Sequence, residues 1–167
     1  MRVIIRPIQI EDAADINKIR TMRGVFENTL GVYSERVIFN EEFIENLTDN
    51  DHMLVAATGD EDKDKVVGFA GLHINTISRC RHSACLGIMI HTDYQGMGIG
   101  KSLMNKSIDL ADNWLKLVRL ELLVFPDNQK ALKLYNSAGF EIEGTKKYAA
   151  IRKGDYSDLL LMARYKI

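Results

Sequence analysis

Three glycines stand at alternate positions, Gly96, Gly98 and Gly100, and Lys101 and Ser102 follow them directly. Glycine carries no Cβ, so its backbone can approach a ligand closely. The segment follows an apolar run and precedes an amphipathic one, which predicts a loop between a buried strand and a helix. The first N–H groups of a helix lack partners and the helix dipole favours negative charge. We therefore expect this loop to bind a phosphate or a pyrophosphate.

The spacing of the glycines differs from two common phosphate-binding motifs. A P-loop requires a glycine five residues before Gly100, where this sequence has Gln95. The dinucleotide fingerprint is Gly-x-Gly-x-x-Gly, whereas the pattern here is Gly-x-Gly-x-Gly. A turn that only permits tight packing between strand and helix is the alternative interpretation.

Hydrophobic periodicity predicts the elements that must hold this loop. A helix between two buried strands requires a parallel crossover, whereas short connections join antiparallel strands. We therefore expect an α/β (α+β) fold with a mixed, twisted central sheet of about seven strands and about four flanking helices. The expected strands are residues 3–5, 53–58, 66–74, 84–90, 118–125, 140–142 and 159–165, and the expected helices are 11–22, 39–47, 99–115 and 128–138. Segment 59–65 is expected to be a solvated turn, and a loop with Gly154 and Asp155 to precede the last strand.

Length and charge restrict the class of protein. The chain has 167 residues, is 46% hydrophobic and 27% charged, and carries a net charge of −1. At roughly 100–200 residues per domain, we expect one domain spanning the whole chain. A net charge near zero argues against nucleic acid as a partner. No apolar run reaches the roughly 18 residues of a membrane helix and no secretory signal is evident, so we expect no membrane partner and a cytoplasmic location.

The run Cys80-x-His82-x-x-Cys85 contains three potential metal ligands. On a strand, Cys80 and His82 would share one face and Cys85 would point to the other, and no fourth ligand is evident. We therefore expect no metal. The same odd spacing disfavours a disulfide between the two cysteines, as in a reducing compartment.

Gln95, Gly98 and Gly100 match the pattern Gln/Arg-x-x-Gly-x-Gly/Ala, and on these residues the chain resembles the Gcn5-related N-acetyltransferases (GNAT), which bind acetyl-coenzyme A. A second block of that family follows the next expected strand and consists of Asn128, Ala131, Leu134, Tyr135, Gly139 and Phe140. Residues 112–115, 141–145, 147–149 and 162–164 further resemble a bacterial subgroup of L-amino acid N-acetyltransferases, related to phosphinothricin acetyltransferases. The resemblance implies a GNAT fold over nearly the whole chain.

The resemblance also implies how acetyl-CoA is held. Backbone groups of Met89 and Ile90 would pair with the pantetheine arm, and Asn128 would contact it, although helix capping alone would also explain Asn128. The pyrophosphate would be bound by backbone amides of Gln95, Gly96, Met97, Gly98, Ile99, Gly100 and Lys101, with Ser102 a further contact. Lys101 either forms an ion pair with a phosphate or is a solvated lysine of the first turn.

Tyr135 is the expected catalytic residue, because the matching tyrosine of the family protonates the departing thiolate. A phenol with a pKa near 10 remains a proton donor at neutral pH. The alternative is a tyrosine that packs on the sheet. Cys85 stands where many members have an acidic residue, so no general base is carried over, and Glu121 on the next strand is either a base acting through water or a surface carboxylate. An α-amine with a pKa near 8 needs a base less than a lysine amine near 10.4.

The acceptor site is expected at Asn28, Thr29, Leu30 and Tyr33, with residues 144–148 nearby, because 28–30 resemble the same segment of the amino-acid-acetylating subgroup. Simple loop packing is the alternative. The implied reaction is direct attack of a primary amine on the thioester, the amine being the α-amine of a small L-amino acid. A protein N-terminus, a phosphinothricin-like antimetabolite and a non-catalytic acyl-CoA sensor are the alternatives. A homodimer is also considered, because dimers occur in the family.

Overall fold

The computed structural model describes residues 1–59 and 64–167, so most of the turn expected at 59–65 lies outside the described residues. Seven strands form one sheet in the order β1-β2-β3-β4-β5-β7-β6. The strands are β1 (Val3–Pro7), β2 (Asp51–Thr58), β3 (Lys65–Ile74), β4 (Ser83–Ile90), β5 (Arg119–Val124), β6 (Glu141–Arg152) and β7 (Asp155–Tyr165). The helices are α1 (Ala13–Arg20), α2 (Arg23–Phe26), α3 (Val37–Glu45), α4 (Ile99–Asp109) and α5 (Gln129–Ser137). The predicted mixed sheet is therefore confirmed.

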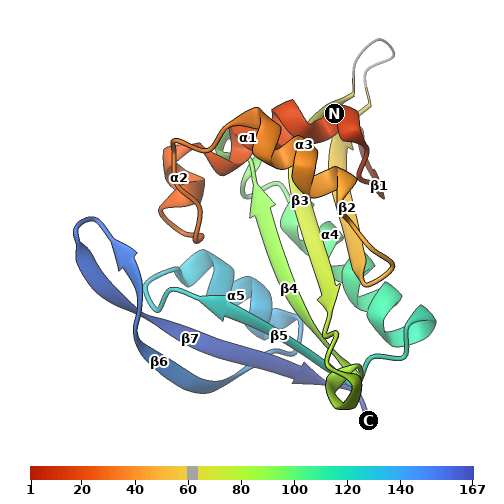
Figure 1. The fold of residues 1–167 in the computed structure, drawn as a ribbon, viewed down its shortest axis with the longest axis vertical. Helices are drawn as coiled ribbons and strands as arrows, with labels where there is room; N and C mark the ends of the chain where they lie inside the picture. The colour runs from red at the N-terminus through yellow and green to blue at the C-terminus, as the bar shows by residue number, and fades with distance from the viewer. Residues whose placement is uncertain (60–63) are drawn as a thin grey trace.

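One pair of neighbouring strands, β4 and β5, is parallel, and α4 supplies the crossover between them. Residues 83–85 of β4 pair with residues 119–121 of β5, and beyond this short ladder the strands diverge (Figure 1). The other neighbouring strands pair in antiparallel fashion. The divergence leaves one edge of the second half of β4 without a strand beside it.

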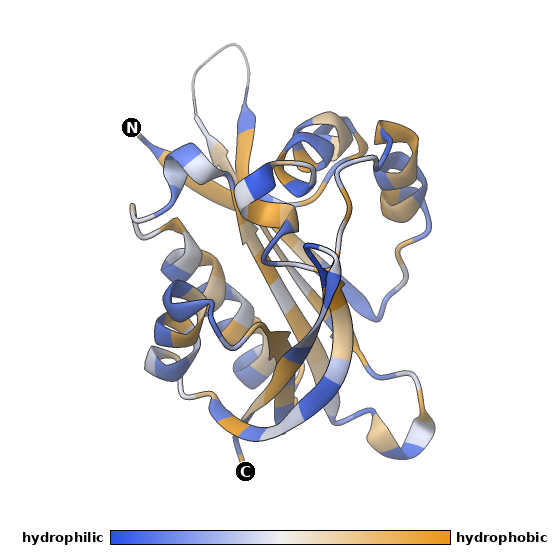
Figure 2. Ribbon diagram, turned by 90° about the vertical axis from the view of Figure 1, so that its left-hand side faces the viewer, coloured by the Kyte–Doolittle hydropathy of each residue, from blue (hydrophilic) through white to orange (hydrophobic). Residues whose placement is uncertain are grey.

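Helices cover the sheet on both faces (Figure 2). On one face α4 and α5 pack over apolar side chains that include Leu72, Leu120 and Phe140. On the other face α1 contributes Ile16 and Ile19 to a separate cluster. Burial of such side chains contributes roughly 1.5–3 kcal/mol each to folding. The two clusters hold β3 and β4 between them and so fix the position of the glycine segment that follows β4.

The largest difference from the expected fold is at the C-terminal end. Residues 141–152 form one long strand, β6, in place of the short strand expected at 140–142. β6 and β7 make a hairpin that turns at Lys153 and Gly154, both of which have positive φ. Two irregularities of register interrupt β6, and most of its side chains are exposed. The strand therefore lacks the regular apolar alternation by which a sequence reveals a strand.

Two helical segments also differ from expectation. The short helix α2 occupies residues 23–26, for which the sequence predicts only a loop. The helix expected at 99–115 is α-helical as far as Asp109 and continues as a π-helical turn over Leu110–Trp114. Asp112 lies in this turn and forms two hydrogen bonds with Arg164 of β7, at 2.8 and 2.9 Å.

None of the helices in the described ranges has the length and apolar character that a bilayer crossing demands. Within those same ranges, no three side chains of histidine, cysteine, aspartate or glutamate come together as potential metal ligands. Cys80 lies in a 3-10 turn and Cys85 in β4, and both thiols are free.

Candidate active site

A cleft of about 360 Å³ opens where β4 and β5 diverge. Both strands contribute to its walls, together with α5 and with the chain around α2. It is mainly apolar, and its lining residues are Arg20, Asn28, Thr29, Leu30, Gly31, Phe69, Leu86, Gly87, Ile88, Met89, Leu123, Val124, Phe125, Tyr135 and Leu159. A narrow cleft between two strands can accept an extended ligand along the free strand edge.

The pattern of hydrogen bonds along β4 shows which backbone groups face this free edge. The His91 amide donates to the Val67 carbonyl at 2.9 Å, and the Asn75 amide donates to the Ser83 carbonyl at 2.9 Å. Because hydrogen-bonded pairs alternate along an antiparallel ladder, Met89 also directs its backbone groups at β3. Ile88 and Ile90 direct theirs at the free edge.

The expectation that Met89 would offer backbone groups to a ligand is therefore revised. Met89 lines the cleft but directs its backbone groups at β3, and it is the backbone groups of Ile88 that face the free edge. Ile90 keeps that role in part, because its carbonyl accepts a hydrogen bond of 3.1 Å from the Gln95 side chain and its amide faces the free edge. The sequence cannot reveal this parity, because it depends on the register between β3 and β4.

The glycine segment has the conformation that an anion-binding loop requires. Gly96 and Gly98 have φ values of +76° and +82°, which side chains rarely adopt. A Cβ placed on either residue would meet no atom within 4 Å, so the space beside them is open. Gly98 is the N-cap of α4, whose first N–H groups have no partner within the helix. The loop therefore offers open space and unpaired N–H groups to an anion.

The remaining residues of this segment serve in different ways. The side chain of Ile99 is buried in the core, so Ile99 can contact a ligand only through its backbone. The side chain of Met97 is exposed, so Met97 can contact a ligand through its backbone or its side chain. A Cβ added to Gly100 would lie 3.5 Å from the Leu134 side chain, which is an ordinary packing distance. The Ser102 hydroxyl donates to the Gly98 carbonyl at 3.2 Å. Lys101 is exposed.

Asn128 is the N-cap of α5, and its Oδ1 accepts a hydrogen bond of 3.2 Å from the Ala131 amide. Helix capping thus accounts for the carboxamide oxygen. The amide nitrogen of the same side chain is not used in capping, so the pantetheine contact implied by the resemblance stays a prediction.

Tyr135 lies on α5 and its ring packs against Phe140, with 6.1 Å between ring centroids. The residue is 7% exposed and lines the cleft together with residues of β4. Burial raises the pKa of Tyr135 to about 12. The phenol therefore remains protonated and serves as a hydrogen-bond donor inside an apolar cleft.

The expected acceptor residues are only partly brought together. Asn28, Thr29 and Leu30 line the cleft, whereas Tyr33 lies outside its lining, is 75% exposed and packs against Phe26. Glu27 is held by two cations, because it pairs with Arg23 at 2.9 Å and with Lys153 at 3.7 Å.

Several lining residues are not apparent from the sequence. Arg20 is the last residue of α1, and periodicity shows it only as a position on a helical face. Phe69, Leu123, Phe125 and Leu159 are identified by periodicity only as strand residues. A charged residue in line with Ala13 and Ile16 on the apolar face of the helix is the one local signal that could have identified Arg20.

The position of the missing general base is occupied by Cys85. Its thiol lies 3.6 Å from Oε1 of Glu121, and burial, together with that carboxylate, raises the pKa of the thiol. Glu121 in turn accepts hydrogen bonds of 3.0 and 2.9 Å from Arg119, which also pairs with Glu143. The carboxylate is thus engaged by a guanidinium and is a poor candidate for a base.

Comparison with known proteins agrees with this geometry. The family model described as the acetyltransferase (GNAT) family matches residues 20–140. The L-amino acid N-acetyltransferase AaaT of Escherichia coli (strain K12) is 34% identical over 164 residues, which cover 98% of each chain. An acetyltransferase of the GNAT family from Streptococcus pneumoniae has a TM-score of 0.82 at 27% identity, covering 99% of this chain and 100% of that one. The spermidine N-acetyltransferase of Vibrio cholerae, solved with CoA and spermine, has a TM-score of 0.84 at 25% identity, covering 98% and 95%.

The chain belongs to the acetyltransferase (GNAT) family. The expectations of a GNAT fold, of an N-acetyltransferase and of acetyl-CoA as its co-substrate are confirmed at the level of that family. The individual site residues and the acceptor stay predictions.

Proposed function

We propose that this protein transfers the acetyl group of acetyl-CoA to the α-amine of a small L-amino acid. The observation that carries the proposal is one cleft lined by both Tyr135 and the free-edge half of β4, with the glycine loop following the end of that strand. This arrangement suits an extended pantetheine arm that carries a thioester at one end and is joined to a pyrophosphate at the other. The L-amino acid N-acetyltransferase relative, similar over 98% of both chains, supports an amino acid as acceptor.

Acetyl-CoA, when bound, supplies an acetyl thioester as the electrophile. The backbone amides of Gly98 to Lys101 would hold the pyrophosphate, and the free-edge groups of Ile88 and Ile90 would hold the pantetheine arm. The Ile88 and Ile90 amides are also the candidate donors to the thioester oxygen as negative charge develops there. Holding both substrates in this way can lower the barrier by about 7–11 kcal/mol.

In the proposed reaction the nitrogen of a neutral amine attacks the thioester carbon, forming the C–N bond while the C–S bond breaks. The amine loses one proton and the leaving sulfur gains one, so the protons balance. Because the amine attacks the thioester directly, no enzyme nucleophile takes part. Tyr135 would donate a hydrogen bond to the leaving sulfur, which contributes roughly 10²–10⁴-fold when an acid is well positioned. Its pKa of about 12 keeps that donor protonated.

Release of free thiol in the presence of acetyl-CoA tests the function. The acceptors are the free L-amino acids, spermidine and peptides with a free N-terminus, each assayed with the purified protein. We expect turnover with one or more L-amino acids and little with spermidine. Turnover only with spermidine or only with peptides would contradict the amino acid assignment. Binding of CoA with no turnover of any amine would favour the sensor alternative.

A further inference from the structure

We propose that Arg20 binds the α-carboxylate of the acceptor and so selects amino acids over amines that lack this group. This inference rests on the proposed function. Among the residues that line the cleft in the described part of the chain, Arg20 alone carries a formal charge. It lines the same cleft as Asn28 and Thr29, the residues at which we expect the acceptor. One cation in an apolar cleft favours an anionic group on the ligand.

The contacts of Arg20 fix its orientation. Its Nε donates a hydrogen bond of 2.9 Å to Oε2 of Glu35. Its guanidinium carbon lies 5.7 Å from the centroid of the Phe39 ring, and the side chain is 26% exposed. Across residues 1–59 and 64–167, no oxygen accepts a hydrogen bond from the two terminal nitrogens of Arg20. These nitrogens form a planar fork that matches the two oxygens of a carboxylate.

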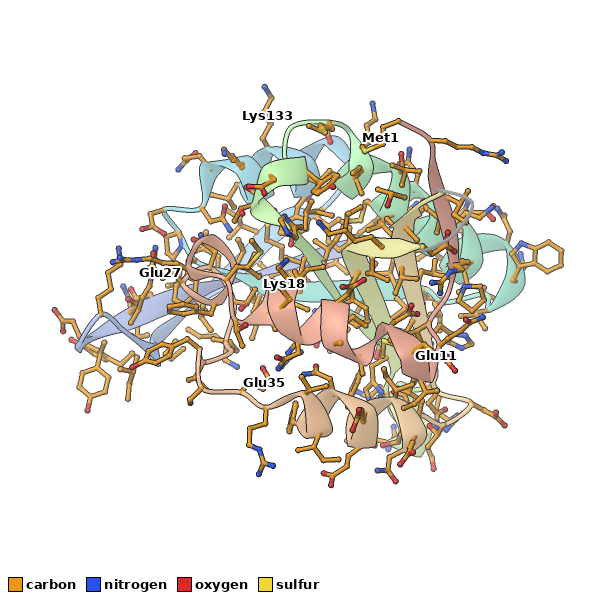
Figure 3. The ribbon with its side chains drawn as sticks, turned by 90° about the horizontal axis from the view of Figure 1, so that it is seen from above. Met1, Glu11, Lys18, Glu27, Glu35 and Lys133 are labelled. Atoms are coloured by element: carbon orange, nitrogen blue, oxygen red, sulfur yellow. The ribbon has the colours of Figure 1, made fainter. Side chains whose placement is uncertain are left out.

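Glu35 pairs with the Nε of Arg20 and leaves the two terminal nitrogens to a ligand. The Glu35 side chain is 7% exposed, and its Oε1 is buried without a hydrogen-bond partner. Figure 3 shows Glu35 reaching toward α1 from the segment that precedes α3. A ligand ammonium group cannot reach that buried oxygen without a rearrangement. In this proposal the acceptor meets the donor fork of Arg20, while Glu35 stays paired with Nε on the other side of the guanidinium.

This arrangement has a direct consequence for specificity. In an α-amino acid the amine and the carboxylate share one carbon, so a fixed carboxylate also fixes the position of the attacking nitrogen. A polyamine has no group that Arg20 can bind, and its cationic amines are repelled by the guanidinium. An amino acid amide keeps the amine and the side chain but loses the negative charge, so it isolates the contribution of the carboxylate.

The test combines a change in the enzyme with a change in the substrate. The best L-amino acid from the panel and its α-amide are assayed with the wild-type protein and with Arg20→Met. We expect Arg20→Met to lower kcat/KM for the acid by about 10- to 100-fold and for the amide by less than about threefold. Comparing the two losses cancels the different basicities of the two amines. Arg20→Lys should recover part of the activity toward the acid, because lysine keeps the charge but loses the fork.

Two controls separate recognition from folding. Arg23→Met removes a neighbouring arginine that is 84% exposed and pairs with Glu27, and it should leave both kcat/KM values unchanged. Titration with CoA should give the same Kd for the wild-type protein and for Arg20→Met, which shows that the cofactor site is intact. If Arg20→Met does not fold, Arg20→Lys, which keeps the charge and most of the side-chain length, provides the same comparison of the losses for the acid and the amide.

Equal losses for the acid and the amide would show that Arg20 only supports the structure and would overturn the proposal. Wild-type kcat/KM values that are equal for acid and amide when each is expressed per neutral amine would also overturn it, while leaving the proposed acetyl transfer to an amino acid scaffold intact. Activity with spermidine but with no amino acid would instead overturn the proposed function, and this inference with it.

Discussion

The thiol of Cys85 and the carboxylate of Glu121 face each other at the last paired position of β4 and β5, with 3.6 Å between Sγ and Oε1. Beyond this pair the strands diverge and the cleft begins. A group at this point could take a proton from an acceptor amine if it were basic. The thiol is kept protonated because burial and the adjacent carboxylate raise its pKa, and the carboxylate is engaged by Arg119.

The first prediction concerns this missing base. We expect kcat/KM for the acceptor to rise with pH and to level off near the pKa of the acceptor's own α-amine, which in a free amino acid lies above the value of about 8 for a peptide N-terminus. Glu121→Gln should leave the shape of this profile unchanged, and Cys85→Ala should do the same. Measuring the profile with two acceptors of different amine pKa checks the prediction, because the inflection should move with the acceptor. If the inflection has the same pH for both acceptors and is lost in Glu121→Gln, Glu121 is the base.

The second prediction concerns Tyr135. Removing the hydroxyl in Tyr135→Phe should lower kcat by about 100-fold and leave the Kd of CoA unchanged, because the ring still packs against Phe140. Since the pKa is about 12, only roughly 1% of the phenol is ionised at pH 10, and no loss of activity from its ionisation is expected below that pH. Tyr156→Phe, in the exposed β6–β7 hairpin, is the matched control. An unchanged kcat, with chemistry shown to limit turnover, would remove the acid role.

The third prediction concerns the glycine loop. Gly98→Ala should raise the Kd of acetyl-CoA by about tenfold or more, because a Cβ would enter the open space and strain the positive φ. Gly154→Ala places the same kind of strain, at φ +80°, in the β6–β7 turn. We expect Gly154→Ala to lower stability without changing the Kd. Isothermal titration of both variants makes the comparison, and equal Kd values would argue against the loop as the pyrophosphate site.

The fourth prediction concerns stability. Hydrogen bonding to Arg164 lowers the pKa of Asp112, whose side chain is 7% exposed. A folded-state pKa below the unfolded value, about 3.9, means that the ion pair stabilises the fold above that pH and is lost as the pH falls through the lower folded value. Asp112→Asn should therefore reduce the free energy of unfolding by about 3 kcal/mol at pH 7.

The difference in the free energy of unfolding between Asp112→Asn and the wild-type protein should become smaller in acid. Urea unfolding at neutral pH and in acid measures this difference. Glu27→Gln removes the surface pair with Arg23 and should change stability little. A difference that is the same at both pH values would contradict the ionic origin of the effect.

Local features of the sequence predicted much of the fold and the phosphate loop. The spacing of Gly96 and Gly98 and the change from strand to helix periodicity are properties of adjacent residues, so they can be read without a structure. Both residues have the positive φ that makes glycine necessary. The GNAT motif then connected this loop to acetyl-CoA.

The features that sequence reasoning missed depend on distant contacts. Tyr33 lies outside the cleft lining and Arg20 lies within it, because the packing of α1 and α2 over the sheet decides which side chains reach the cleft. The backbone role moved from Met89 to Ile88 because the register with β3 sets the parity of β4. The long strand β6 was missed because its exposed side chains and interrupted register hide the alternation.

The free edge of β4 has a consequence for amide hydrogen exchange. The Met89 amide is directed at β3, so it should exchange slowly whether or not a ligand is bound. The Ile88 and Ile90 amides face the cleft and should exchange quickly in the free protein. A bound pantetheine arm that takes the place of the absent neighbouring strand would slow the exchange of these two amides and leave Met89 unaffected. The amides along the two edges of a single strand would then report separately on folding and on binding of the ligand.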